Sequence, residues 1–180
     1  FCGLGGFRIG MESNGAECVF SSDNDKYVSK VYENNFEENP FLDITKIDAK
    51  NIPNHDLLCA GFPCQAFSIG GHRKGFEDTR GTLFFDVLRI LKEKKPNAFF
   101  IENVKGITNH DSGNTINVIR KKLDLAEYNI HETILNTYDF GIPQNRERWY
   151  CVGFKKELED DKFKFPKKKK LNIFLEDIIK

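Results

Sequence analysis

The run Ala60-Gly61-Phe62-Pro63-Cys64-Gln65 decides the fold class of this chain. It follows the largely apolar residues 56–60, and a short apolar run that ends in glycine is typical of a buried strand in a parallel sheet. Gly61 permits a tight backbone path and Pro63 fixes its own φ angle, so the run predicts a turn at the carboxyl end of that strand. Open α/β sheets bind ligands at this edge. The turn therefore makes Cys64 a candidate reactive thiol, with a buried structural cysteine as the alternative.

Helical and strand-like patterns alternate along the rest of the chain. The spacing of apolar residues predicts helices over 7–14, 26–36, 82–94 and 114–125. Short apolar or alternating runs predict strands over 16–20, 56–60, 98–101, 128–135 and 148–154. A chain of 180 residues fits one domain with a sizeable core. The alternation predicts an α/β fold with a doubly wound, mostly parallel sheet.

Charge and cysteine content limit the classes of function. Lys+Arg and Asp+Glu each total 27, so the chain has no overall basic footprint for nucleic acid, although a local basic groove would be enough. Its five cysteines include no Cys-x-x-Cys pair and no Cys/His spacing typical of zinc, so we expect free thiols, a reducing compartment and no metal. No apolar run approaches the ~18 residues of a membrane helix, which favours a cytoplasmic protein without membrane contact.

The two ends of the chain differ from its middle. The sequence starts at Phe1 directly on a glycine loop, and we expect that the first strand has lost its beginning. Residues 155–170 are mostly charged and include Lys167-Lys168-Lys169-Lys170, a run typical of a solvated linker and less often of a phosphate contact. We expect residues 171–180 to add one short helix.

The opening loop and an acid that follows it form the first candidate site. Gly3, Gly5 and Gly6 would let the backbone approach a ligand, and Asp23 follows near the ~20-residue separation at which such folds place a ribose-binding acid. Arg8 stands where the dinucleotide pattern requires its third glycine. The pattern therefore favours a nucleoside without phosphates, with a plain tight turn as the alternative.

A second candidate site consists of Cys64, Glu102, Arg146 and Arg148, which lie at the ends of expected strands. A thiolate is a nucleophile, a carboxyl group holds or delivers a proton, and a guanidinium grips a carbonyl oxygen. Each residue also has a structural alternative, as a buried thiol, a cap or a surface charge. Spacing alone does not bring the four together.

Four motifs follow one another in a characteristic order: Phe1-x-Gly3-x-Gly5-Gly6, Pro63-Cys64-Gln65, Glu102-Asn103-Val104 and Gln144-x-Arg146-x-Arg148. In this order they resemble the DNA (cytosine-5) methyltransferases, and in particular the small bacterial HhaI-type enzymes of restriction–modification systems. The similarity covers residues 1–154. It implies a Rossmann-like, S-adenosylmethionine-dependent catalytic domain over this range.

The resemblance also implies a reaction and roles for the second site. The reaction would be transfer of a methyl group from S-adenosylmethionine to C5 of a cytosine flipped out of double-stranded DNA. Cys64 would be the thiolate that adds to C6, and Glu102 would contact N3 and the exocyclic amine. Arg148 would hold O2, and Arg146 would support the reactive state of the thiol.

The resemblance assigns cofactor and DNA contacts as well. Asp23 would take the ribose hydroxyls, and Asp43 with Ile44 would meet the adenine edge. Asn24 replaces a bulkier residue that is common in the family, which weakens one surface for adenine stacking. The implied cofactor residues are Phe1, Gly3, Leu4, Gly5, Gly6, Asp23, Asn24, Asp43, Ile44, Pro63 and Leu83. The implied DNA contacts are Gln65, Ser68 and Arg80, and residues 68–80 would form an arm that closes over DNA.

Members of the resembled family continue beyond this point with a target-recognition region and a C-terminal helix. We therefore expect residues 155–180 to be a linker and the start of a missing part, and residues 1–180 alone to methylate DNA little. A separate chain is a possible source of the recognition region. The alternatives are an RNA methyltransferase of the tRNA-methylating branch, a non-catalytic fragment that binds cofactor or DNA, and a nucleotide-dependent oxidoreductase, which Arg8 disfavours.

Overall fold

The computed structural model describes residues 1–63, 83–158 and 162–169. Backbone contacts divide the chain into two units, Phe1–Ile101 and Glu102–Lys180. The predicted turn at Cys64, the expected arm over 68–80 and the expected short helix over 171–180 lie outside the described residues.

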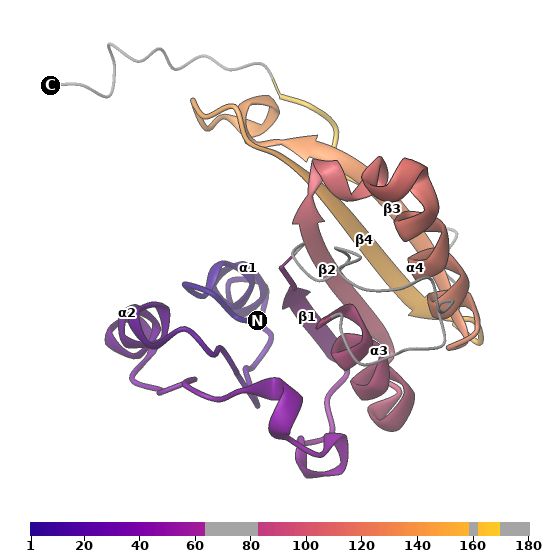
Figure 1. The fold of residues 1–180 in the computed structure, drawn as a ribbon. Helices are drawn as coiled ribbons and strands as arrows, with labels where there is room; N and C mark the ends of the chain where they lie inside the picture. The colour runs from indigo at the N-terminus through magenta and orange to yellow at the C-terminus, as the bar shows by residue number, and fades with distance from the viewer. Residues whose placement is uncertain (64–82, 159–161, 170–180) are drawn as a thin grey trace, which may run out of the picture. The chain divides into compact units, whose positions relative to one another are not determined.

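The first unit contains α1 (Gly6–Glu12), α2 (Lys26–Phe36), β1 (Leu57–Gly61), α3 (Leu83–Lys94) and the first part of β2 (Ala98–Val104). Two short 3₁₀ turns, Ile44–Lys46 and Ala49–Asn51, lie between α2 and β1. β1 and β2 are neighbours in the sheet, and Figure 1 shows them pointing in the same direction. Apolar residues at helical spacing form the buried face of α3: Phe84, Val87, Leu88 and Leu91.

The second unit contains the end of β2, α4 (Asn114–Asp124), β3 (Tyr128–Asn136) and β4 (Glu147–Lys155). Short 3₁₀ turns lie at Lys105–Thr108, His110–Gly113 and Thr137–Phe140. β4 lies between β2 and β3 in the sheet, and β3 and β4 are antiparallel, with Tyr128 opposite Lys155 and Asn136 opposite Glu147. The apolar stripe of α4 is buried on the side that contacts β3: Ile116, Ile119 and Leu123.

Residues 162–169 form an extended segment, here called the lysine strap, which is fixed to the second unit at two places. The Phe163 ring lies 5.1 Å from the His131 ring on β3. Further along, Lys168 Nζ lies 2.9 Å from Asp139 Oδ2. The lysines of the strap are exposed while Phe163 is half-buried, so an apolar contact holds a strongly charged segment against the strands.

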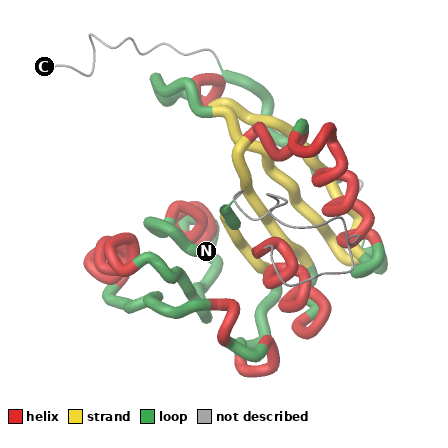
Figure 2. The backbone as a smooth tube through the Cα atoms, viewed as in Figure 1, coloured by secondary structure: helices red, strands yellow, loops and turns green. Residues whose placement is uncertain are grey.

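One expectation from the sequence requires correction. No strand forms over 16–20, and Figure 2 shows the connection between α1 and α2 as a loop. An extended run becomes a strand only when a neighbouring backbone pairs with it. Near this run, within the described residues, the structure has only an isolated bridge between Asp23 and Phe41. The predicted α/β arrangement is present, and β3 adds an antiparallel strand at the edge of the sheet.

β2 also extends further than predicted. The predicted strand covers 98–101, but β2 continues to Val104, with Phe99, Ile101 and Asn103 buried in alternation. Glu102 therefore lies within the strand and on its other face. Within the described ranges no helix is long and apolar enough to cross a membrane.

The start of α1 requires a glycine at position 5. Gly5 has φ +92°, and a Cβ built there would lie 2.2 Å from Phe36 Cε2 and 3.3 Å from Tyr32 Cε2. Gly10, within α1, has no atom within 4 Å of such a Cβ. The glycine loop is thus packed directly against two aromatic rings of α2.

We expect Gly5→Ala to lower the free energy of unfolding by about 1–3 kcal/mol, because the added methyl overpacks the rings of α2 in a left-handed backbone conformation. Gly10→Ala is the matched control and should raise the free energy of unfolding by about 0.5–1 kcal/mol, because alanine favours a helix interior. Urea unfolding followed by circular dichroism measures both. Equal free energies for the two variants would show that the packing at Gly5 is not restrictive.

Candidate functional site

The carboxylate of Asp23 is hydrogen-bonded to the backbone of the glycine loop. The backbone N–H of Gly3 donates to Asp23 Oδ2 at 2.9 Å, and the N–H of Asp25 donates to Oδ1 at 3.1 Å. Gly3 has φ +55°, which points its N–H at the acid without steric cost. A carboxylate has about four acceptor positions, so about two remain for the hydroxyl groups of a ligand. The structure thus brings together the loop and the acid that the sequence pattern pairs.

A small hollow beside the loop gathers six of the predicted cofactor residues. It is lined by Phe1, Asp23, Asn24, Asp43, Ile44 and Leu83, together with Ser22 and Leu42. Sequence reasoning missed Ser22 and Leu42, whose only signal is that each directly precedes a predicted acid. Ser22 Oγ donates to the Leu42 carbonyl at 2.7 Å, which ties the two acid-bearing segments together.

Asp43 caps the 3₁₀ turn that follows it. Its Oδ1 accepts from Thr45 Oγ1 at 2.7 Å and from the Thr45 N–H at 3.1 Å. The hydrogen bond from the Thr45 hydroxyl, followed by the one from its backbone, lowers the pKa of Asp43. Ile44 beside it is buried. The hollow therefore offers a fixed negative charge next to an apolar wall, a combination that suits the polar edge and flat face of a nucleobase.

The other predicted cofactor residues lie outside the lining of the hollow. Gly6 is the first residue of α1, and Leu4 is 57% exposed. Pro63 is exposed at the last described position before the gap.

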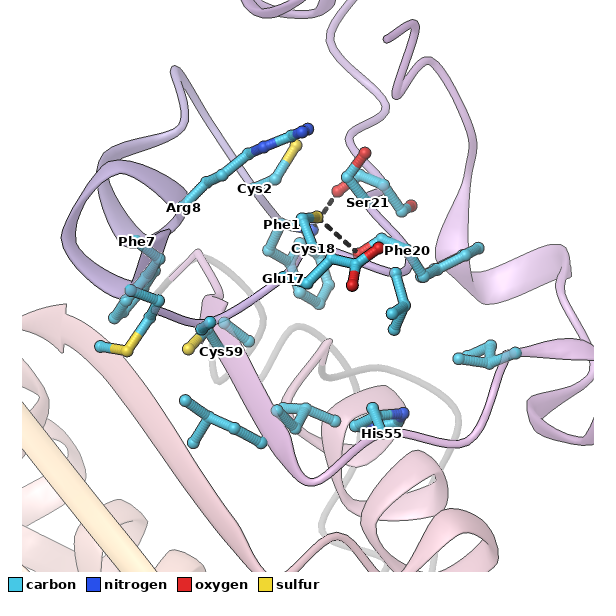
Figure 3. Close-up of a pocket in the computed structure, with 18 of the residues that line it drawn as sticks. Phe1, Cys2, Phe7, Arg8, Glu17, Cys18, Phe20, Ser21, His55 and Cys59 are labelled. Carbon is cyan, nitrogen blue, oxygen red and sulfur yellow. Dashed lines mark hydrogen bonds between the residues drawn. The ribbon is translucent and has the colours of Figure 1, made fainter. Parts of the chain in front are cut away.

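A larger cavity of the first unit lies elsewhere and is mostly apolar (Figure 3). It has a volume of about 540 Å³ and is bounded by α1, residues 15–22 and β1. Phe7, Cys18 and Cys59 are among the side chains around it in Figure 3, and Cys18 Sγ donates to the Phe20 carbonyl at 3.7 Å. The smaller hollow is the one lined by Asp23 and Asp43, while this cavity offers mainly apolar surface.

Burial keeps several thiols of the chain protonated. It raises the pKa of Cys2 to about 11 and that of Cys59 to about 12. The pKa of Cys151, on β4, is also raised by burial. None of these three thiols has the accessible, ionised character of a nucleophile.

In the second unit the structure brings two predicted catalytic residues into contact. Arg148 Nε lies 3.0 Å from Glu102 Oε1, and the two side chains are 21% and 23% exposed. A second hydrogen bond from Arg148 Nη1 to the Glu147 carbonyl, at 2.8 Å, orients the guanidinium. The pair thus places a hydrogen-bond acceptor, the Glu102 carboxylate, beside a fixed hydrogen-bond donor, the Arg148 guanidinium. Together they can bind a heterocyclic ring that has both donor and acceptor groups on its edge.

Two neighbours complete this group. Tyr150 lies two positions after Arg148 on β4, and its pKa is raised by burial and then by the charge of Glu102. Sequence reasoning missed Tyr150, although alternation along the strand puts it on the face of Arg148. Arg146 is exposed, and its backbone N–H donates to Asn136 Oδ1 at 3.0 Å. Arg146 is therefore held through its main chain.

The remaining predicted residues lie outside the described residues. These are the candidate nucleophile Cys64 and the expected DNA contacts Gln65, Ser68 and Arg80. Among the described residues, no group of three or more His, Cys, Asp or Glu side chains is arranged to hold a metal ion.

The mixed α/β fold, with its acid-capped glycine loop, defines a Rossmann-like methyltransferase. Solved structures agree: S. pombe Dnmt2 methyltransferase matches with a TM-score of 0.70 and 26% identity over 89% of this chain and 50% of that chain. A Spodoptera frugiperda DNMT2 variant matches with a TM-score of 0.73 and 25% identity over 95% of this chain and 52% of that chain. The chain itself belongs to the C-5 cytosine-specific DNA methylase family, whose match covers residues 1–180.

Curated relatives support this membership. The chain is 55% identical to the Type II methyltransferase M.HhaI of Haemophilus parahaemolyticus over 99% of its own length and 55% of that protein. It is 56% identical to the Type II methyltransferase M.HaeII of Haemophilus aegyptius over 93% of its own length and 52% of that protein. The chain therefore spans about half the length of the curated relatives that it matches.

Proposed function

We propose that this chain is the catalytic core of a DNA (cytosine-5) methyltransferase of a restriction–modification system. The observation that carries the proposal is the Glu102–Arg148 pair, at 3.0 Å, in a chain of the cytosine-specific DNA methylase family. The substrate would be a cytosine flipped out of double-stranded DNA, since its reacting carbons are not accessible within the base stack. The direct test is the formation of 5-methylcytosine in duplex DNA by the full-length protein, with tRNA as the contrasting substrate.

In this proposal the residues of the second site have separate tasks, and that of Arg146 is to support the reactive state of the Cys64 thiol. The thiolate of Cys64 adds to C6, which makes C5 electron-rich enough to attack a methyl group. Glu102 hydrogen-bonds N3 and the exocyclic amine and so favours the addition, while Arg148 holds O2. C5 then bonds to the methyl carbon, and the sulfur that carried the methyl leaves with the electron pair of the broken S–C bond. When C5 next loses its proton, the electrons of the C5–H bond re-form the ring double bond and the S–C6 bond breaks. The thiolate is thereby regenerated.

The cofactor of this reaction is proposed to be S-adenosylmethionine, which supplies the methyl group as an electrophile on its sulfonium. Support comes from the hollow beside the glycine loop. There Asp23 retains free acceptor positions for ribose hydroxyls, and Ile44 lies beside the charged Asp43 as a wall for adenine. Arg8 occupies the position of the third glycine in the dinucleotide pattern, which fits a nucleoside without a pyrophosphate.

The charge of the lysine strap supports the proposal that the substrate is a polyanion such as DNA. Five exposed lysines lie within eight residues, on a chain whose overall net charge is zero. Lys168 fixes the strap at Asp139, in the 3₁₀ turn that directly follows β3. The register places the end of β3 opposite the start of β4, where Arg148 is found. Part of the positive charge of the strap therefore lies at the end of the strands that carries the proposed base-binding pair.

Target recognition is proposed to come from a segment outside residues 1–154, either in the same chain or in a separate one. The net charge of zero leaves little sequence-independent attraction to DNA, so the proposed partner segment would supply much of the affinity.

Asp23→Ala tests the cofactor assignment. We expect the substitution to weaken S-adenosylmethionine binding by about 1.5–3 kcal/mol, because it removes a charged acceptor from the ribose hydroxyls. Asp25→Ala is the control, since Asp25 caps α2 by accepting from two backbone N–H groups and does not line the hollow. Isothermal calorimetry measures both variants. Tight binding of NAD with no binding of S-adenosylmethionine would contradict the cofactor assignment itself.

A further inference from the structure

A half-buried arginine on α1 joins two helices. Arg8 Nη1 donates to Glu38 Oε2 at 2.6 Å and to Tyr32 Oη at 3.1 Å, while Nε donates to Glu12 Oε1 at 2.8 Å. Its guanidinium carbon also lies 4.6 Å from the centre of the Phe36 ring. The Arg8 side chain is only 17% exposed, and a permanently charged group with so little water requires such partners.

Glu38 has a further partner on the opposite side. Its second carboxylate oxygen, Oε1, accepts from Ser21 Oγ. Glu37, the residue after α2, has φ +57° and ends the helix, so the chain turns there and Glu38 leaves the helix axis. One carboxylate thus connects α1 with the segment that carries Asp23.

This connection spans the two walls of the proposed cofactor site. Arg8 lies on the helix that begins at the glycine loop, and Ser21 lies two residues before Asp23. Directly, the two walls are joined by the hydrogen bond from Gly3 to Asp23 and by those from the Phe1 amino group and the Cys2 N–H to the Ser22 carbonyl. The bridge through Glu38 is an additional, side-chain brace between the same two segments.

We infer that Glu38 is a positioning residue, whose bridge between Arg8 and Ser21 sets the spacing of the glycine loop from Asp23 and thereby the affinity for the cofactor. The inference rests on the proposed function. Glu12 provides the contrast, because it pairs with the same arginine but lies on the same helix. A bond within α1 stabilises that helix without fixing its distance from Asp23.

The test compares Glu38→Ala with Glu12→Ala in the full-length protein. The two carboxylates are 38% and 35% exposed, and each substitution removes one ion pair from Arg8. We expect similar decreases in the midpoint of thermal unfolding. The dissociation constant of S-adenosylmethionine, measured by calorimetry, should rise about tenfold in Glu38→Ala and less than about twofold in Glu12→Ala. A tenfold effect lies within the usual range of energetic coupling between a binding site and a residue outside it. At saturating cofactor, kcat should change less than the KM for the cofactor.

Two more variants separate positioning from stability. Ser21→Ala removes one end of the bridge, keeps the Arg8–Glu38 pair and should also weaken cofactor binding. Glu38→Gln should restore most of the affinity, because its amide oxygen can accept from Arg8 while its NH₂ group donates to Ser21 Oγ. Equal dissociation constants in Glu38→Ala and Glu12→Ala, or an unchanged one in Ser21→Ala, would overturn the inference. No binding by the unsubstituted protein would instead overturn the proposed function.

Discussion

Duplex DNA with 5-fluorocytosine at the target position is expected to remain covalently joined to the full-length protein through Cys64 once the methyl group has been transferred. The final elimination requires loss of a proton from C5, and fluorine cannot leave as a proton. The S–C6 bond should therefore persist under denaturing conditions. A shift in a denaturing gel, followed by mass mapping of the modified peptide, measures the adduct and its position.

Cys64→Ser should abolish this adduct and lower turnover by roughly 10³-fold or more, because a hydroxyl is a far weaker nucleophile than a partly ionised thiol at neutral pH. Cofactor binding should persist. Cys59→Ala is the internal control, since Cys59 lies on β1 with a pKa raised to about 12 by burial, and trapping should continue in this variant. An adduct at another residue, or methylation that survives in Cys64→Ser, would remove the basis of the proposed mechanism.

Glu102→Gln is expected to have the second-largest effect. The amide retains the shape of the side chain but can neither deliver a proton nor pair as a charge with Arg148 at 3.0 Å. We expect the methylation rate to fall by roughly 10²–10⁴-fold, the usual contribution of a positioned acid or base. Single-turnover kinetics with saturating DNA and cofactor measure this step without product release.

Glu147→Gln provides the matched control for Glu102. Glu147 is the first residue of β4, and its carboxylate pairs with Lys105 Nζ at 2.9 Å. This substitution likewise removes a carboxylate from an ion pair in the second unit, but we expect the methylation rate to change less than about threefold, because an exposed ion pair contributes about 1 kcal/mol or less. A comparable loss in both variants would indicate a general electrostatic effect instead of a role for Glu102.

Elements with their own boundary signals could be predicted from the sequence. α2 covers Lys26–Phe36, as predicted, because Asp25 caps its first turn by accepting from the N–H groups of Tyr27 and Val28. Residues 16–20 have a comparable strand pattern yet form no strand, since a strand depends on a pairing partner that the local pattern does not contain.

The candidate site was harder to predict from the sequence than the helices, because it is formed by contacts between residues that are distant in the chain. Glu102 and Arg148 come from β2 and β4, and only the resemblance to a family linked them in advance. Arg8 was interpreted from the sequence only as a departure from the dinucleotide pattern. Its hydrogen bonds to Tyr32 and Glu38 join residues that are distant in the sequence. No local pattern could therefore have shown that Arg8 connects several segments.

The raised pKa values of Cys2, Cys59 and Cys151 have a practical consequence for labelling. Cys2, with a pKa near 11, and Cys59, with a pKa near 12, present almost no thiolate at neutral pH, and Cys151 is 0% exposed. A mild alkylating reagent such as iodoacetamide therefore meets little competing reactivity from these positions. Adduct formation should concentrate on the two other cysteines of the chain, Cys18 and Cys64. An electrophile carried on a cytosine analogue could then act as an activity-based probe with a low background from the protein itself.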